Sequence, residues 1–203
     1  MPEGDDPVDL DPDVEIDTAD LAPAEAVDDD AIEREETFLD AHDDQRLFCQ
    51  SWAPADAEPT RGAVALLHGY GEHSSRYGHV AAALVRAGFG VMAIDARGAG
   101  RSTGKRAYVE SFEDYVSDYR ILVERVARRW PDLPRFALGH SNGGLVVLEY
   151  ALRYDQSESE LDGLVLTSPF LGFGIDVPKP KAAAARVLSH LWPSFALPNG
   201  LDP

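Results

Sequence analysis

The sequence predicts an α/β fold in which a mostly parallel sheet is covered by helices on both faces. Three observations lead to this prediction. Short apolar runs of strand length alternate with longer segments of helical periodicity, as expected when helices connect parallel strands. Glycine-rich turns follow the apolar runs, at the sheet edge where such folds bind ligands. One of these turns, Gly-His-Ser-Asn-Gly at 139–143, stands between a strand-like run and a helical pattern.

The folded part is predicted to begin with an antiparallel hairpin. Residues 36–40 and 46–52 are strand-like and flank the turn-like sequence Ala-His-Asp-Asp at 41–44. The next apolar run, residues 63–67, is continuous, which is typical of a strand buried on both faces. A helix is then predicted over 76–87, because its apolar residues fall on one side and a glycine follows it.

The same alternation continues toward the C-terminus. Residues 89–94 are predicted to form another buried strand. The clearest helical pattern covers 111–130, with Ser111 as a plausible N-cap, an apolar stripe along one side and Pro131 as its stop. Residues 161–167 are the last predicted strand. Helices therefore separate most of the predicted strands, which favours parallel pairing.

The turn at 139–143 matches the pattern Gly-x-Ser-x-Gly. It follows the apolar run 135–138 and precedes the helical pattern 145–152, which places Ser141 at the apex of a sharp strand-to-helix turn. Such a turn lifts the hydroxyl clear of the sheet edge and holds a non-glycine residue in a strained conformation. The flanking glycines are needed because larger side chains would collide there. We interpret Ser141 as a nucleophile rather than an ordinary turn serine.

Two further glycine-rich turns follow predicted strands. The turn at 68–77 begins with His-Gly, and its glycines allow a backbone N–H to approach developing negative charge on a ligand. The turn at 95–104 resembles a phosphate loop at first sight. It lacks the lysine of the G-x-x-x-x-G-K-[ST] pattern and the third glycine of the dinucleotide pattern. We therefore expect a structural loop beside the active-site edge, and no nucleotide.

The acidity of the chain is concentrated in its N-terminal segment. The net charge is −18, and residues 1–36 hold sixteen Asp or Glu and one Arg. Residues 37–203 hold twenty acidic and seventeen basic residues. A halophilic surface and a basic face for nucleic acid are both excluded by this distribution. Composition predicts a disordered, solvated leader, with an acidic partner-binding arm as the alternative.

Other compositional features set the expected cellular context. Cys49 is the only cysteine, which excludes an internal disulfide framework and suits a reducing compartment. No run approaches the roughly 20 apolar residues of a membrane span, and the N-terminus has no secretory pattern. We expect a cytoplasmic protein. The histidines and acids show no metal-ligand spacing, so no metal or cofactor is expected.

Taken in order, four segments resemble the α/β-hydrolase fold: residues 68–77, 95–104, 111–115 and 139–144. More narrowly, the chain resembles the monoacylglycerol lipase and lysophospholipase branch, grouped with the serine aminopeptidase (S33) hydrolases. The resemblance extends over about 36–203. It implies a serine hydrolase of carboxylic esters that acts on a small lipid or ester substrate and uses no cofactor.

The resemblance also implies roles for particular residues. Ser141 would be the nucleophile, and the backbone N–H groups of Tyr70 and Asn142 would form the oxyanion hole. Relatives usually have Met where this chain has Asn142, but a backbone donor tolerates that exchange. His68 would stabilise its turn through local hydrogen bonds of its imidazole. The remaining supporting residues of the two turns would be Gly69, Gly139, His140 and Gly143.

The implied organisation has three parts. Residues 1–35 would be the disordered acidic tail, 36–172 the first part of the hydrolase core, and 173–203 the start of a helical cap. An amphipathic cap helix is predicted over 181–192. The cap would lie over the acyl pocket, and any peripheral contact with a membrane would be made there.

The departure from the family pattern concerns the rest of the catalytic triad. In the family an acid and then a histidine follow the serine, each after a later strand, and these 203 residues contain no such pair. His190, the only histidine after Ser141, is interpreted as the polar edge of the cap helix. We therefore expect the chain alone to be inactive. An aminopeptidase or amidase of the same fold and a non-catalytic remnant or binding protein are the alternatives.

Overall fold

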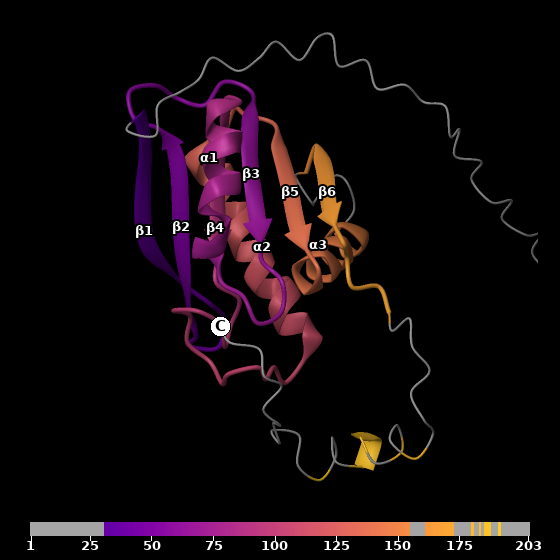
Figure 1. The fold of residues 1–203 in the computed structure, drawn as a ribbon. Helices are drawn as coiled ribbons and strands as arrows, with labels where there is room; N and C mark the ends of the chain where they lie inside the picture. The colour runs from indigo at the N-terminus through magenta and orange to yellow at the C-terminus, as the bar shows by residue number, and fades with distance from the viewer. Residues whose placement is uncertain are drawn as a thin grey trace, which may run out of the picture.

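The computed structural model describes residues 31–154 and 161–172, together with positions 180, 183, 185–187 and 191. Most of the predicted acidic tail and most of the predicted cap helix over 181–192 lie outside these residues. The described part is built around one sheet (Figure 1).

The sheet has six strands within the described residues, in the order β1-β2-β4-β3-β5-β6. β1 pairs with β2 and β2 with β4 in antiparallel fashion, whereas β4, β3, β5 and β6 run parallel. The prediction of a mostly parallel sheet is therefore confirmed. The strands are β1 (Ile32–Asp40), β2 (Arg46–Pro54), β3 (Gly62–Leu67), β4 (Phe89–Ile94), β5 (Arg135–His140) and β6 (Gly163–Thr167).

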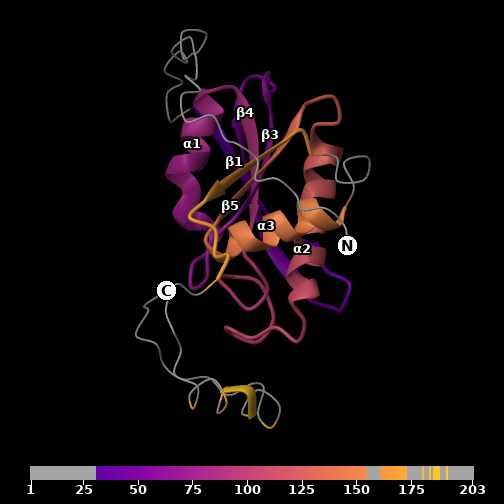
Figure 2. The ribbon, with the colours of Figure 1, turned by 90° about the vertical axis from the view of Figure 1, so that its right-hand side faces the viewer.

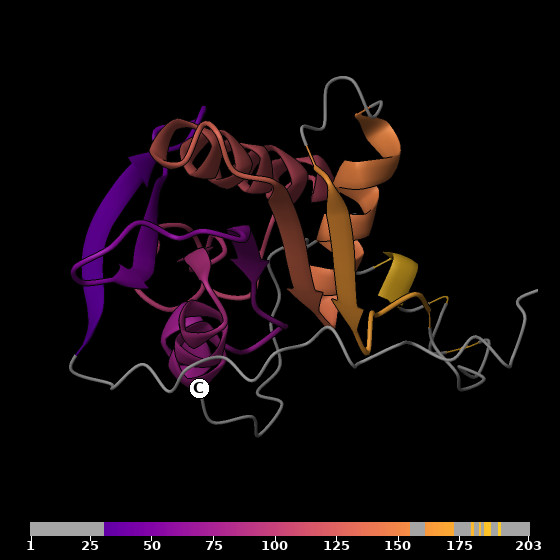
Figure 3. The same ribbon diagram turned by 90° about the horizontal axis from the view of Figure 1, so that it is seen from above.

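Helices cover both faces of the sheet. α1 (Gly78–Arg86) packs on one face through Ala81 and Val85, and the first turn before it is the 3₁₀ helix η2 (Ser74–Tyr77). α2 (Phe112–Arg129) and α3 (Asn142–Arg153) cover the other face (Figures 2 and 3). All six residues of β3 are buried because this central strand is covered from both sides.

The longest helix begins where its sequence indicates. The Ser111 hydroxyl accepts a hydrogen bond of 3.2 Å from the N–H of Glu113, and the Asp114 carboxylate accepts one of 3.2 Å from the N–H of Ser111. This reciprocal arrangement satisfies backbone donors that have no partner within the helix. The predicted helix over 111–130 is confirmed, with Ser111 as its N-cap.

The start of the folded part and the start of the first helix differ from their predicted positions. β1 begins at Ile32, inside the range 1–35 predicted for the tail, because its pairing with β2 extends back to Ile32, which lies opposite Pro54. The charged side chains of Glu33 and Glu35 are exposed, so backbone pairing rather than apolar burial orders this part of the strand. The helix predicted over 76–87 begins two residues later, at Gly78, after the 3₁₀ turn.

Candidate active site

Ser141 lies at the apex of the turn between β5 and α3, with φ 51° and ψ −115°. Positive φ is unusual for a residue with a side chain, so the backbone is strained at the hydroxyl-bearing position. Crowding explains the flanking glycines. A Cβ on Gly139 would lie 2.7 Å from the carbonyl oxygen of Gly143. A Cβ on Gly143 would lie 2.4 Å from the carbonyl oxygens of Leu67 and His68.

Gly143→Ala is expected to destabilise the protein by about 1–3 kcal/mol, because backbone carbonyls cannot swing away from the new methyl group. Urea unfolding measures this loss. Gly78→Ala is the matched control, since a Cβ on Gly78 at the start of α1 meets nothing within 4 Å. Equal stability of the two variants would contradict the packing argument.

The last residue of β6 and the chain just after it bind both backbone groups of Ser141. The N–H of Ser141 donates to the carbonyl oxygen of Thr167 at 3.0 Å, and the N–H of Phe170 donates to the carbonyl oxygen of Ser141 at 3.0 Å. Ser168, between these partners, also has a positive φ of 46°. Sequence reasoning missed this contribution. Its one local signal is the Thr-Ser-Pro run directly after the last predicted strand.

The His140 ring lies against β6 and the turn that carries Tyr70. Its Nδ1 lies 3.0 Å from the Thr167 hydroxyl oxygen, and its ring centroid lies 6.5 Å from that of Tyr77. A Cβ on Gly69 would come within 3.2 Å of the His140 ring. His140 therefore packs the elbow against the turn that carries Tyr70.

Tyr70 and Asn142, whose backbone N–H groups are the candidate oxyanion donors, come from different segments of the chain. Asn142 is the first residue of α3, where backbone N–H groups have no partner within the helix and the helix dipole is positive. Tyr70 follows β3 and is half exposed. Both residues line a cavity of about 500 Å³ at the carboxyl edge of the sheet. The two residues that carry the candidate oxyanion donors therefore meet at one cavity, and Asn142 directly follows Ser141 in the chain.

Glu72 shapes the turn that carries Tyr70. Its Oε2 accepts hydrogen bonds from the N–H of Gly69 at 3.0 Å and from the Tyr77 hydroxyl at 2.7 Å. Partial burial opposes ionisation, but these hydrogen bonds prevail and lower the pKa of Glu72. Sequence reasoning did not assign Glu72 a role. Its position three residues after Gly69 was the available signal.

His68 is buried, and both of its ring nitrogens are in use. The N–H of Ala96 donates to Nε2 at 2.9 Å, so Nδ1 carries the proton and donates to the carbonyl oxygen of Gly69 at 2.7 Å. Burial lowers the pKa of His68 and favours this neutral form. The ring links the chain just after β3 to the chain just after β4 by hydrogen bonds. Because both of its nitrogens are bonded, neither is available to act as a base.

Asp95 connects the two glycine-rich turns. Its buried carboxylate accepts hydrogen bonds from the N–H and hydroxyl of Ser74 at 2.7 and 2.6 Å, and from the N–H of Arg101 at 2.7 Å. Gly100 has φ +46°, and a Cβ there would lie 2.0 Å from Asp95 Oδ2. Only glycine lets the loop approach the carboxylate this closely.

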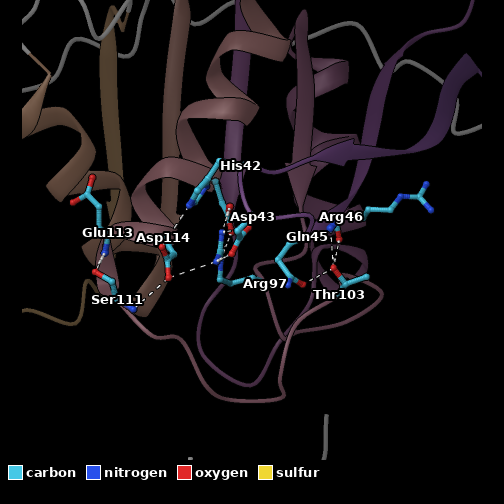
Figure 4. Close-up of polar contacts among 10 residues, drawn as sticks. His42, Asp43, Gln45, Arg46, Arg97, Thr103, Ser111, Glu113 and Asp114 are labelled. Carbon is cyan, nitrogen blue, oxygen red and sulfur yellow. Dashed lines mark hydrogen bonds and ion pairs between the residues drawn. The ribbon is translucent and has the colours of Figure 1, made fainter. Parts of the chain in front are cut away.

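A buried arginine joins the β1–β2 turn, the loop after β4 and α2. Nε and Nη2 of Arg97 donate to the two carboxylate oxygens of Asp118 at 2.7 Å each, and Nη1 donates to Asp43 at 2.7 Å. Figure 4 shows Arg97 between Asp43 and Asp114, whose carboxylate lies 3.5 Å from Nη1. Burial opposes the charge, but the bonds to Asp118 and Asp43 raise the pKa of Arg97. Arg97 also lines the cavity.

The described residues supply a serine and backbone donors but no side-chain base in contact with Ser141. Among them, no histidine or carboxylate makes a hydrogen bond to the Ser141 hydroxyl. His190, the only histidine after Ser141 in the sequence, lies outside the described residues.

A serine at a strained strand-to-helix turn, on a sheet of this order, defines the class of α/β-hydrolase proteins. The chain belongs to the serine aminopeptidase S33 family, whose model matches residues 58–203. The resemblance inferred from the sequence is confirmed.

The chain is similar in sequence to two named lipases. The chain is 42% identical over 154 residues to a monoacylglycerol lipase of Mycolicibacterium smegmatis, covering 76% of this chain and 53% of the relative. It is 34% identical over 158 residues to a monoglyceride lipase of Rattus norvegicus, covering 77% and 49%. The chain therefore spans about half the length of these relatives.

Solved structures agree with this assignment. A monoacylglycerol lipase of Paleococcus ferrophilus is 35% identical, with a TM-score of 0.57. The match covers 84% of this chain and 56% of that lipase. A soluble variant of the monoglyceride lipase of Saccharomyces cerevisiae is 26% identical, with a TM-score of 0.68. This match covers 83% of this chain and 56% of the yeast enzyme. No helix of the described part is long and apolar enough to cross a membrane.

Proposed function

We propose that the protein containing this chain hydrolyses carboxylic esters of lipids, with monoacylglycerols or lysophospholipids as substrates. The observation that carries the proposal is the strained Ser141, next to the N-terminus of α3, whose first amides have no partner within the helix, and near a cavity that Tyr70 and Asn142 share. The names of the relatives support the substrate class, since they include monoacylglycerol lipases and a phospholipase of Bacillus subtilis that is 33% identical over 139 residues.

The proposed chemistry is nucleophilic. The Oγ of Ser141 attacks the ester carbonyl carbon and loses its proton to a base, and the carbonyl oxygen becomes an oxyanion. The N–H groups of Tyr70 and Asn142 stabilise that negative charge. When the intermediate collapses, the base returns its proton to the departing alcohol and an acyl ester remains on Ser141. Water then attacks this ester and releases the carboxylic acid and the free serine. In this proposal the histidine base and its acid come from outside the described residues.

The proposal includes the organisation and location inferred from the sequence. The predicted core segment 36–172, extended to Ile32 by the start of β1, forms the first part of the catalytic core; 173–203 begin a cap over the substrate, and an acidic tail precedes the core. The cap is where the protein would contact a membrane surface peripherally, and the protein would act in the cytoplasm. The substrate is a small lipid or ester molecule, with no nucleic acid involved.

Parallel assays of ester and amide substrates on the full-length protein test this function. We expect fatty acid release from 1-monooleoylglycerol or lysophosphatidylcholine, and little release of nitroaniline from aminoacyl 4-nitroanilides. The reverse preference would establish the alternative, an aminopeptidase of the same fold. Turnover of neither substrate class by the folded protein would contradict both and favour a binding protein.

A further inference from the structure

A second cavity, of about 480 Å³, lies between the C-terminal half of α2 and the β1–β2 hairpin. It shares no lining residue with the cavity at the serine elbow. Thr37 and Ser51 contribute hydroxyl groups to it, and Cys49 and Met92 are buried beside them. It is a separate space, formed by parts of the molecule that the proposed hydrolysis does not use.

The strand register places these hydroxyls on one face of the sheet. Thr37 is paired with Cys49 across β1 and β2, and Ser51 is paired with Met92 across β2 and β4. Alternate residues of a strand share a face, so Cys49 and Ser51 point to the same side. Cys49 and Met92 belong to the core cluster that includes α2, which identifies this side as the one facing the helix.

Two arginines of α2 form the opposite wall. Arg125 and Arg129 are four residues apart, so their side chains leave the same side of the helix. The Nε of Arg125 is buried and has no hydrogen-bond partner among the described residues. The only ion pair described for Arg129 is a long one, 3.8 Å, with the largely exposed Glu58. By contrast, Arg128 pairs with Glu124 on the exposed side of α2.

Two acidic residues line this cavity, and only one of them lacks a described partner. Glu36 is already held by hydrogen bonds from Arg34 at 2.8 Å and from Arg101 at 2.6 Å. Glu35 lines the cavity and makes no described ion pair. A buried, unpaired donor on a charged guanidinium is unfavourable, so the Nε–H of Arg125 calls for an acceptor, which water, Glu35 or a ligand in the cavity can supply.

We propose that this cavity binds the phosphate group of a small phosphate ester. Two guanidinium groups and two hydroxyls offer more donors than a carboxylate can accept, and they suit the several oxygens of a phosphate. Cys49 and Met92 provide an apolar floor for the organic part of the ligand. The Glu35 carboxylate repels the phosphate and so weakens its binding. When the ligand is absent, Glu35 pairs with the arginines instead.

Arginine side-chain NMR on the full-length protein tests the proposal. The Nε–H resonance that disappears in Arg125→Gln is assigned to Arg125 and followed as sodium phosphate, then glycerol 3-phosphate, is added. We expect a saturable shift, with the affinity about tenfold weaker in Arg129→Gln and unchanged in Arg128→Gln. Glu35→Gln should bind more tightly than the wild-type protein. No shift at saturating millimolar ligand, or an equal loss in Arg128→Gln, would overturn the proposal.

A second experiment decides whether the phosphate group belongs to a lipid headgroup or to a soluble ester. Vesicles of phosphatidylcholine with and without phosphatidic acid are sedimented with the wild-type protein and with Arg125→Gln. Arg125-dependent binding to the phosphatidic acid vesicles assigns the site to a lipid headgroup, whereas binding of glycerol 3-phosphate alone assigns it to a soluble ester. If Glu35→Gln instead lowers stability as much as Arg125→Gln, with no binding of either ligand, the two residues are an internal ion pair and the site is refuted.

Discussion

Replacing Ser141 with alanine in the full-length protein is expected to lower kcat on a monoacylglycerol by about 10⁶-fold, because loss of the nucleophile leaves only binding and the oxyanion donors. Stability should hardly change, since the elbow is held through the backbone of Ser141 by Thr167 and Phe170. Steady-state turnover and urea unfolding measure the two quantities.

Covalent labelling provides an independent check of the same residue. A fluorophosphonate should form its adduct on the peptide that contains Ser141. Ser74 and Ser102 are buried and bonded to Asp95, so they should not react. Ser168→Gly is the control, because glycine tolerates the φ of 46° at that position. Unchanged labelling in Ser141→Ala would disprove the assignment.

Replacing Arg97 with methionine should reduce the free energy of unfolding by about 3–5 kcal/mol, because it leaves a buried carboxylate without its partner. The carboxylate is that of Asp118, whose side chain is 2% exposed and takes both of its 2.7 Å bonds from Arg97. The free energy of unfolding is measured in urea.

A double variant tests whether Arg97 stabilises the protein through its charge pair with Asp118. Arg97→Met with Asp118→Leu removes both charges, so it should recover most of the stability that Arg97→Met loses. Arg128→Met is the surface control. Its pair with Glu124 is exposed, and the loss should stay below about 1 kcal/mol. A double variant as unstable as the single one would show that Arg97 acts through packing and not through its charge.

Much of the candidate site could be predicted because its signals are local in sequence. The elbow pattern spans five consecutive residues at the junction of β5 and α3, and a Cβ on Gly139 would collide with Gly143 and Gly144 of the same turn. Ser111 caps a helix that begins at the following residue. Each of these features follows from sterics and hydrogen bonding over a few residues, which an amino-acid pattern records directly.

Local patterns in the sequence were enough to predict the alternation of strands and helices, the serine at the sharp turn and the glycine-rich turns that follow the strands. The distant groups that complete these features are defined by the folded structure. Thr167 reaches Ser141 because β6 lies beside β5, and Arg97 meets Asp43 across 54 positions because the β1–β2 turn folds onto the loop after β4. Such partners are chosen by strand order and close packing of the whole chain, and no short pattern around either residue encodes them.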